Sequence, residues 1–349
     1  MFKSNGCTDL GNPIPCIVKG ASRVSVVEVG FDNDPNIRTK SLYANGRMQV
    51  QVIVLMTVAD DNGEPVEMPP EVLASVKLVH YNGGENLKNG WGAVDTENEY
   101  LHDLPGTASL ARASAHHSST VANAVPRSFA KKIVFWVSAS AVGSTRIAAQ
   151  VKIGGTVFTT NGTLPGRHDK SVTLTALLPN AYSGVNFHFD MVHGGKPWDG
   201  VRIHKYYVGL YPIRDGGVQT KLLNWSSANN AAGASVEFFQ VFNQDKYKNL
   251  PHAVGFMVDK SIKEFSWASL ANGGRYKTAV NERDGMLTIV QMTVNYAGRD
   301  SNKQAVFPFS AFDAYGTEHR LRIRTDLGRD NVTPDKEREY FVNFILERN

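Results

Sequence analysis

The chain has 349 residues, of which 42% are apolar and 20% are charged, so it is long enough for about two or three domains with hydrophobic cores. Its formal net charge is +4, and the lysines and arginines are spread along the chain rather than clustered as in a nucleic-acid-binding protein. No stretch approaches the roughly 18 apolar residues that a membrane-spanning helix needs. We therefore expect no nucleic-acid partner and no membrane span.

The N-terminal segment contains both cysteines, Cys7 and Cys16, and lacks the apolar run of a secretory signal peptide. We therefore expect synthesis and first folding in the cytoplasm. If the protein works outside a cell, it leaves by another route, such as lysis or a dedicated machine. Two cysteines are too few for a disulfide framework or a zinc ribbon. A Cys7–Cys16 disulfide and two free thiols both remain open.

Residues 1–105 are predicted to form a first β-sandwich domain. The segments SRVSVVEVGF and RMQVQVIVLMTVAD alternate apolar and polar residues, which is typical of strands with one buried face. Asn62-Gly63 follows the second segment and indicates a tight turn, because both residues accept positive φ at low cost. The prolines of PPEVLAS predict one helical turn before the next strand.

The segment FDNDPN places Asp32, Asp34 and Asn36 at the first, third and fifth positions of a calcium-loop pattern. An EF-hand needs Gly at the sixth position and Glu at the twelfth, where this chain has Ile37 and Tyr43. An EF-hand is therefore excluded. A turn capped by the Asp and Asn side chains is favoured, and a simpler calcium-binding loop remains open.

Ala and Ser dominate the segment TASLARASAHHSSTVANA, a composition typical of a linker. We expect a linker at residues 106–124, a second β-sandwich domain at 125–213 and a third at 214–349. In the third domain, KSIKEFSWASL is predicted to be a short helix. With roughly fifteen strands and few short helices, the sequence predicts an all-β fold of multiple antiparallel β-sandwich or jelly-roll domains.

The segment NFHFDMVHGGKPWDGVRIHKYY contains three histidines and two aspartates within 22 residues. We expect a β-hairpin with HGGKPWDG as its turn, in which Phe187 and Phe189 face one side of the sheet and His188 and Asp190 the other. The expected register pairs Asp190 with Arg202, and it also pairs the histidines at 188 and 204. In this interpretation the polar residues are ordinary cross-strand neighbours.

The same segment also permits an iron-binding interpretation. His188 and Asp190 form a His-x-Asp pair, and with His252 they resemble the 2-His-1-carboxylate facial triad of non-haem iron oxygenases. That resemblance implies an iron cofactor, with Lys260 holding the carboxylate of a co-substrate. The chain has no G-x-S-x-G or Walker motif. We expect a protein that is not an enzyme and holds no cofactor, with the iron oxygenase as the alternative.

Three tryptophans, Trp91, Trp198 and Trp225, lie among turn residues. Loop tryptophans flanked by Asp, Asn and Gly can stack on sugar rings or contact a partner protein, and they can also fold back over the end of a sandwich. We expect at least one of the three to be a contact residue.

Arginines alternate with apolar residues in HRLRIRTD, which places Arg320, Arg322 and Arg324 on one face of a strand. Such a face can meet phosphates or a sulfated glycan. The favoured interpretation is a solvated outer face.

An all-β chain that is rich in Gly and aromatic residues, with small-residue connectors and no signal peptide, resembles bacteriophage virion proteins of the jelly-roll capsid, spike or tail attachment type. The resemblance implies a structural protein located in the virion, an assembly of identical copies such as a trimer, contacts with other virion proteins, and binding to a host surface glycan. A monomeric carbohydrate-binding protein is a further alternative.

Overall fold

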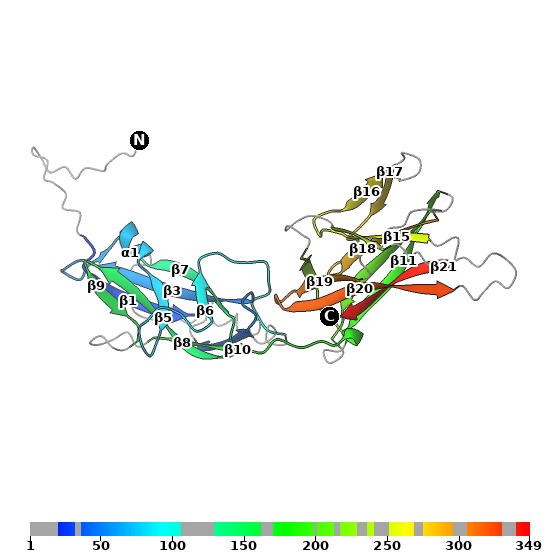
Figure 1. Ribbon diagram of the computed structural model, residues 1–349. Helices are drawn as coiled ribbons and strands as arrows, with labels where there is room; N and C mark the ends of the chain where they lie inside the picture. The colour runs from blue at the N-terminus through cyan, green and yellow to red at the C-terminus, as the bar shows by residue number, and fades with distance from the viewer. Residues whose placement is uncertain are drawn as a thin grey trace, which may run out of the picture. The chain divides into compact units, whose positions relative to one another are not determined.

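The computed structural model describes residues 20–31, 36–105, 129–161, 170–198, 201–212, 217–228, 236–240, 251–268, 275–295, 306–329 and 340–349. Strands dominate these residues and confirm the predicted all-β class (Figure 1). The helices in this part of the chain are α1 (Pro70–Ala74), as predicted from PPEVLAS, and the single-turn 3₁₀ helix η1 (Gly184–Asn186). No helix among the described residues is long and apolar enough to cross a membrane.

The chain divides into two compact units, Met1–Leu178 and Pro179–Asn349, rather than the three domains expected. β3 (Gln49–Ala59) pairs with β7 (Lys131–Ala139), so two segments predicted to lie in separate domains are neighbours in one sheet. Likewise, β12 (Val201–Leu210) pairs with β18 (Leu287–Asn295), across the boundary predicted at residue 213. The expected linker at 106–124 lies outside the described residues.

Unit 1 contains two five-stranded sheets, one with the order β1-β3-β7-β6 and β4 attached to β3, the other with the order β2-β10-β8-β5 and β9 attached to β8. Their pairings are antiparallel apart from the parallel pair of β2 and β10. The two sheets face each other, with β1 against β8 and β2 against β3. The remaining strands are β1 (Arg23–Gly30), β2 (Thr39–Tyr43), β4 (Pro65–Val66), β5 (Lys77–His80), β6 (Trp91–Val94), β8 (Gly143–Ile153), β9 (Thr156–Thr159) and β10 (Val172–Leu177).

The sequence of β3 explains its central place in unit 1. Its even-numbered residues from 50 to 58 are apolar and almost fully buried, because successive side chains of a strand point to opposite faces and this set faces the opposing sheet. On the other face, Leu55 is 42% exposed. Val27 and Val29 of β1 and Leu174 of β10 are buried in the same way.

Unit 2 contains a five-stranded sheet with the order β11-β12-β18-β15-β14, a four-stranded sheet with the order β13-β19-β20-β21, and a separate hairpin of β16 and β17. All of its strand pairings are antiparallel. The remaining strands are β11 (Phe187–Trp198), β13 (Leu222–Ser226), β14 (Val236–Gln240), β15 (Pro251–Met257), β16 (Glu264–Ala268), β17 (Arg275–Ala279), β19 (Val306–Asp313), β20 (Glu318–Arg329) and β21 (Tyr340–Arg348).

Both faces of the five-stranded sheet contribute to a hydrophobic core. One face packs against the four-stranded sheet in an inter-sheet core that includes Tyr206, Leu287 and Ile289. The opposite face carries Val290 and Met292 and packs against the β16–β17 hairpin in a smaller hairpin core (Figure 1). A strand buried on both sides has an apolar run instead of strict alternation, as the segment IVQMTV shows.

The helix predicted for KSIKEFSWASL is wrong, because this segment contains β16. Phe265 of β16 is buried in the hairpin core, while Glu264 and Ser266 on either side of it are exposed. Pairing with β17 and burial of Phe265 therefore override the local preference for a helix.

The hairpin of β11 and β12 exists, but its predicted register is wrong. Asp190 lies opposite Tyr207, and His188 lies opposite Gly209. Residues 193–198 continue the strand instead of forming the turn, with two irregularities of the β-bulge kind on either side of Gly195. Glycine tolerates the backbone conformations of such bulges. Because β11 continues past the expected turn, each of its residues lies opposite a different residue of β12 from the one expected.

Candidate functional site

The structure does not bring the three residues of the proposed iron site together. His252 lies on β15, three strands away from β11, which is about 14 Å at the usual strand spacing. Through the register, His252 is level with Trp198 at the far end of β11 from His188 and Asp190. No group of three or more potential metal ligands occurs within the described ranges.

The iron-binding interpretation expects the ammonium group of Lys260 to bind the carboxylate of a co-substrate. In the structure this group contacts the protein backbone. Its Nζ donates a 2.7 Å hydrogen bond to the carbonyl oxygen of Met286. Burial lowers the pKa of Lys260. The calcium-loop residues Asp32 and Asp34 lie outside the described residues.

Asp190 belongs to a charge cluster on the side of the sheet that carries the β16–β17 hairpin. Nη1 of Arg283 donates a 2.9 Å hydrogen bond to Oδ2 of Asp190, and its guanidinium group lies 4.3 Å from the centre of the Tyr207 ring. Glu282 accepts hydrogen bonds from Nζ of Lys205 at 2.5 Å and from the hydroxyl of Tyr207 at 3.0 Å. Glu282 and Arg283 lie in the turn between β17 and β18, so the cluster ties this turn to β11 and β12.

The electrostatics of the charge cluster follow from these contacts. Hydrogen bonds from Lys205 and Tyr207 lower the pKa of Glu282, and burial together with the Glu282 hydrogen bond raises the pKa of Tyr207. Burial lowers the pKa of Lys205, but its contacts with Glu282 and Tyr207 outweigh burial and leave that pKa raised. The cluster is thus built of mutually satisfied groups, which suits a structural tie rather than acid–base catalysis.

β11 is the first strand in the order of the five-stranded sheet of unit 2. Among the described residues, β12 is the one strand that pairs with β11. The register is regular from residue 187 to 193. His188 and Asp190 are exposed, Met191 is 44% exposed, and Val185 just before the strand is 75% exposed. An edge strand with exposed apolar residues offers its backbone to another strand.

Two of the three predicted contact tryptophans are core residues. Trp225 is 8% exposed and packs in the inter-sheet core, where its Nε1 donates a 2.9 Å hydrogen bond to the carbonyl oxygen of Val258. Trp91 is 9% exposed in β6. Their indole rings are therefore not available for stacking on a sugar. Trp198 lies on β11, and its side chain is outside the described part of the chain.

The three arginines of β20 lie beside acidic partners. Glu347 of β21 accepts hydrogen bonds from Nε of Arg322 at 2.9 Å and from Nε of Arg324, and these contacts lower its pKa, with Arg324 contributing most. Arg320 is an exposed side chain that lies 3.6 Å from Glu318. This arrangement agrees with a solvated outer face.

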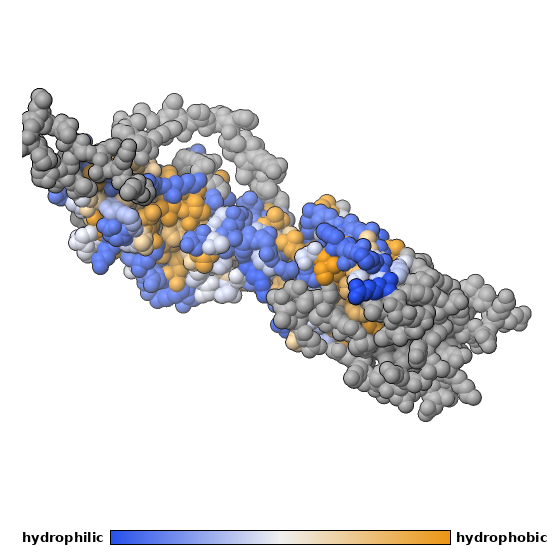
Figure 2. Space-filling view, turned by 90° about the horizontal axis from the view of Figure 1, so that it is seen from above, coloured by the Kyte–Doolittle hydropathy of each residue, from blue (hydrophilic) through white to orange (hydrophobic). Residues whose placement is uncertain are grey.

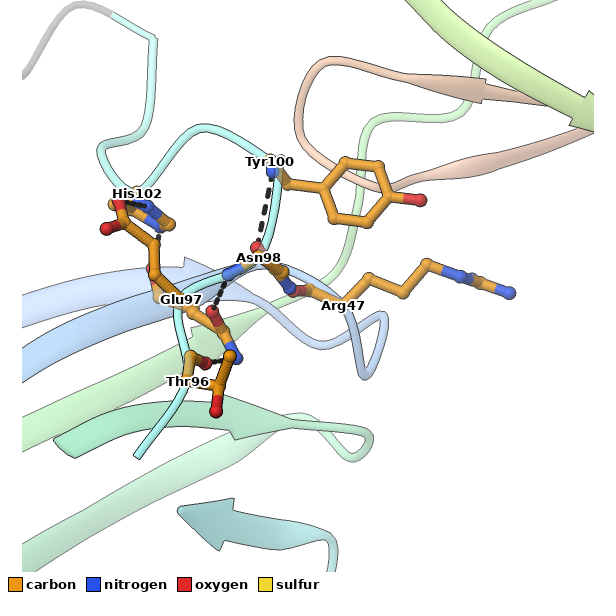
Figure 3. Close-up of polar contacts among 7 residues, drawn as sticks. Arg47, Thr96, Glu97, Asn98, Tyr100 and His102 are labelled. Carbon is orange, nitrogen blue, oxygen red and sulfur yellow. Dashed lines mark hydrogen bonds and ion pairs between the residues drawn. The ribbon is translucent and has the colours of Figure 1, made fainter. Parts of the chain in front are cut away.

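A polar loop that the sequence analysis did not single out covers part of unit 1 (Figure 3). Gln49 holds residues 95–105, because its side chain donates to the carbonyl oxygen of Thr96 at 3.4 Å and accepts from the backbone of Asn98 at 2.9 Å. His102 lies between Glu97, at 2.8 Å, and the Trp136 ring, whose centre is 4.4 Å from the imidazole centre. The acidic run DTENEYLHD is the sequence feature that could have indicated this polar loop.

Apolar side chains gather on one face of unit 1 (Figure 2). Leu55 and Val94, which are 42% and 50% exposed, lie on the face of the β1-β3-β7-β6 sheet that points away from the opposing sheet. Glu28 and Lys132 flank Leu55 in the same row of the sheet.

No family model and no curated protein matches the chain. Among solved structures, the C-terminal domain of the antigen I/II-family protein AspA of Streptococcus pyogenes aligns over 84% of this chain and 96% of its own, with 10% identity and a TM-score of 0.21. The BspA C-terminal domain of Streptococcus agalactiae aligns over 84% of this chain and 96% of its own, with 11% identity and a TM-score of 0.19. At such TM-scores these alignments carry no argument about function.

Proposed function

We propose that the chain is a structural protein that works by assembling with copies of itself, as a capsid, spike or tail attachment subunit of a virion. The open edge of β11 carries this proposal. Its regular stretch at residues 187–193 has β12 as its one described strand partner, and it exposes Met191 on the same edge. Soluble proteins usually cover or blunt such an edge, and assembly into a larger structure is one way to cover it.

The other polar groups of unit 2 support a structural role. The charge cluster ties a turn to the five-stranded sheet, and the arginines of β20 lie beside Glu347 and Glu318. A buried pair, His319 and Asp313, orders the turn before β20, since Oδ1 of Asp313 accepts from the backbone of Thr317 at 2.9 Å while its Oδ2 lies 3.0 Å from the imidazole. These contacts all lie within unit 2.

The partners in this proposal are identical copies and neighbouring virion proteins. A host surface glycan is a further partner in the proposal, with Trp198 as the one predicted contact tryptophan that remains after Trp91 and Trp225 are assigned to the core. The resemblance to virion proteins implies a trimer.

Molar mass in solution, measured by sedimentation equilibrium over a wide range of protein concentration, tests the proposal. We expect an oligomer that dissociates on dilution. A chain that remains monomeric at the highest attainable concentration would overturn the proposal. Metal analysis of the same sample tests the iron alternative, which requires stoichiometric iron that is lost on His188→Ala.

A further inference from the structure

We propose that the edge strand β11 pairs in antiparallel fashion with β11 of a second copy. The two Phe189 residues then lie directly opposite each other, and the two-fold axis passes midway between them. The five-stranded sheets of the two copies would then form one continuous sheet. This inference rests on the proposed self-assembly and specifies its contact.

Geometry limits the pairing to the first half of β11. Residues 187–193 follow a regular register with β12, whereas the irregularities on either side of Gly195 disturb the second half. A β-bulge bends and twists the edge on which it lies, and this hinders pairing with a further strand. The available edge is therefore a stretch of about seven residues, which is enough for a β-augmentation contact.

Symmetry leaves few registers for such a pair. Residues directly opposite each other in an antiparallel pair point to the same face of the sheet. A two-fold axis perpendicular to the sheet leaves the same side chains on the same face in both copies. The axis must therefore lie level with one residue of the strand, midway between the two copies of that residue, and not level with the peptide bond between two residues. That residue then lies opposite itself, and its neighbours on either side lie opposite each other.

Charge complementarity selects the register centred on Phe189. In it, His188 of each copy lies opposite Asp190 of the other, which gives two attractive pairs. An axis at Asp190 would place two carboxylates opposite each other, and an axis at His188 would do the same with two imidazoles. An axis at Met191 would leave Asp190 opposite Val192, without a polar partner.

The apolar face of β11 agrees with the same register. Phe189 would lie opposite itself, and Phe187 opposite Met191 of the other copy. Aromatic pairs and contacts between sulfur and an aromatic ring are favourable across adjacent strands. The Phe189 ring already stacks on Tyr206, with 4.7 Å between ring centres, so it is held in place, and the 44% exposure of Met191 would decrease on pairing.

The existing contact of Asp190 is compatible with this pairing. Arg283 donates to Oδ2 of Asp190, which leaves Oδ1 to accept a hydrogen bond from His188 of the second copy. The imidazole of His188 packs at 4.4 Å from the Tyr211 ring centre. A contact between two short strands buries less than the roughly 1,200 Å² of a standard interface, so we expect reversible association.

Disulfide trapping tests the register. In a background in which Cys7 and Cys16 are replaced by Ser, the double variant His188→Cys/Asp190→Cys places cysteines directly opposite each other, at a Cα separation of about 4.5–5.5 Å, which a disulfide can span. Mild oxidation should yield covalent dimers of this variant. The single variants His188→Cys and Asp190→Cys should yield few covalent dimers, because the one introduced cysteine then lies opposite a residue that is not cysteine.

Two outcomes of this experiment would overturn the inference. One is a double variant that forms no more dimer than the single variants. The other is efficient dimer formation by Asp190→Cys alone, which would place the axis at that residue.

A charge exchange tests the energetics. His188→Asp and Asp190→His each place like charges opposite each other and should raise the dissociation constant about tenfold or more. The double variant His188→Asp/Asp190→His restores opposite charges across the axis and should recover part of the association; the recovery is incomplete because Asp190→His also removes the carboxylate that Arg283 contacts. Sedimentation equilibrium of the original chain and the three variants under the same conditions provides the measurement.

The two proposals fail in different ways. Suppose that the original chain forms oligomers, that the charge exchange leaves their dissociation constant unchanged, and that disulfide trapping yields no covalent dimer. The β11 contact is then wrong, and self-assembly uses another surface. If the original chain is monomeric, both proposals are wrong. A two-fold contact also predicts an even number of copies, in contrast to the trimer that the resemblance implies.

Discussion

Trp225 and Val258 are joined by a 2.9 Å hydrogen bond from the indole Nε1 to the backbone carbonyl oxygen. The bond connects β13 of one sheet to the residue that follows β15 of the opposing sheet, and Trp225 is 8% exposed. A tryptophan whose sequence neighbours suggest a loop is therefore part of the core of unit 2, because the ring finds both apolar contacts and a partner for its one polar atom.

Replacing Trp225 should destabilise unit 2 in two separable steps. Trp225→Phe keeps most of the ring but leaves the Val258 carbonyl without this donor, which should cost about 1–3 kcal/mol. Trp225→Ala also opens a cavity and should cost about 3–5 kcal/mol. The free energy of unfolding in urea measures both. The control is Val218→Ala, at a residue that is 69% exposed, and equal losses in all three variants would contradict the core assignment.

The hydroxyl of Tyr206 donates a 2.7 Å hydrogen bond to Gln291 in the inter-sheet core. Burial raises the pKa of Tyr206 to about 12, although a backbone contact with Phe344 opposes the shift. A raised pKa favours the protonated, folded form, so this contribution to stability is present below the unfolded pKa of about 10 and is lost as the pH rises through the folded pKa.

The free energy of unfolding should therefore fall more steeply above about pH 10 in the original chain than in Tyr206→Phe, which cannot ionise at this position. Urea denaturation at about pH 9 and about pH 11 gives the two slopes. The variant should be less stable at both values, since it loses the hydrogen bond to Gln291. Identical slopes would show that Tyr206 does not titrate differently in the folded state.

Glu282 should contribute to stability in a pH-dependent way. The hydrogen bonds from Lys205 and Tyr207 lower its pKa, so its contribution is present above the unfolded pKa of about 4.3 and is lost as the pH falls through the lower folded pKa. Because the Glu282 side chain is 49% exposed, we expect a loss of about 1 kcal/mol or less for Glu282→Gln at neutral pH, and a smaller loss at about pH 3.

Glu264→Gln is the matched control for Glu282→Gln. Glu264 also pairs with a lysine, Lys277, but the two side chains are 58% and 62% exposed, so the pair should contribute almost nothing. Thermal or urea unfolding of both variants at the two pH values is the measurement. A larger loss for Glu264→Gln than for Glu282→Gln would refute the structural role assigned to the charge cluster.

Gly90 occupies a turn that no other residue fits well. Its φ is +87°, and a Cβ at this position would lie 2.9 Å from Cβ of Ala141 and 3.1 Å from the Ala141 backbone nitrogen. Gly90→Ala should therefore destabilise unit 1 by about 1–3 kcal/mol. Gly92→Ala is the control, because a Cβ at Gly92 meets nothing within 4 Å, and it should change the free energy of unfolding by less than about 1 kcal/mol.

The comparison of β3 with β16 shows where sequence reasoning succeeded and where it failed. The alternation around Val54 predicts a strand, and β3 is one, because the two-residue period is a property of the local backbone. The prediction of a single buried face is wrong, since Ile53 and Thr57, on the same face as the exposed Leu55, are also buried. Around Phe265 the local pattern allowed a helix, and burial in the hairpin core decided for a strand.

The candidate site shows the same division. The sequence correctly placed His188 and Asp190 on one face of β11, opposite to Phe187 and Phe189. It could not show that Asp190 meets Arg283, 93 positions later in the chain. Nor could the sequence show that the strand of His252, β15, lies three strands away from β11, since sequence spacing does not reveal the order of strands in a sheet.

The amino-acid sequence by itself determined that this protein is built mainly from strands in antiparallel pairs, because alternation of side chains and turn-forming residues act over a few positions; the parallel pair of β2 and β10 is an exception that it did not predict. Only the tertiary structure decided that there are two units, that β3 pairs with β7, and that β11 lies at the edge of the sheet formed by the described strands. These features depend on backbone hydrogen bonds between distant segments, and the backbone groups that form them are the same in almost every residue.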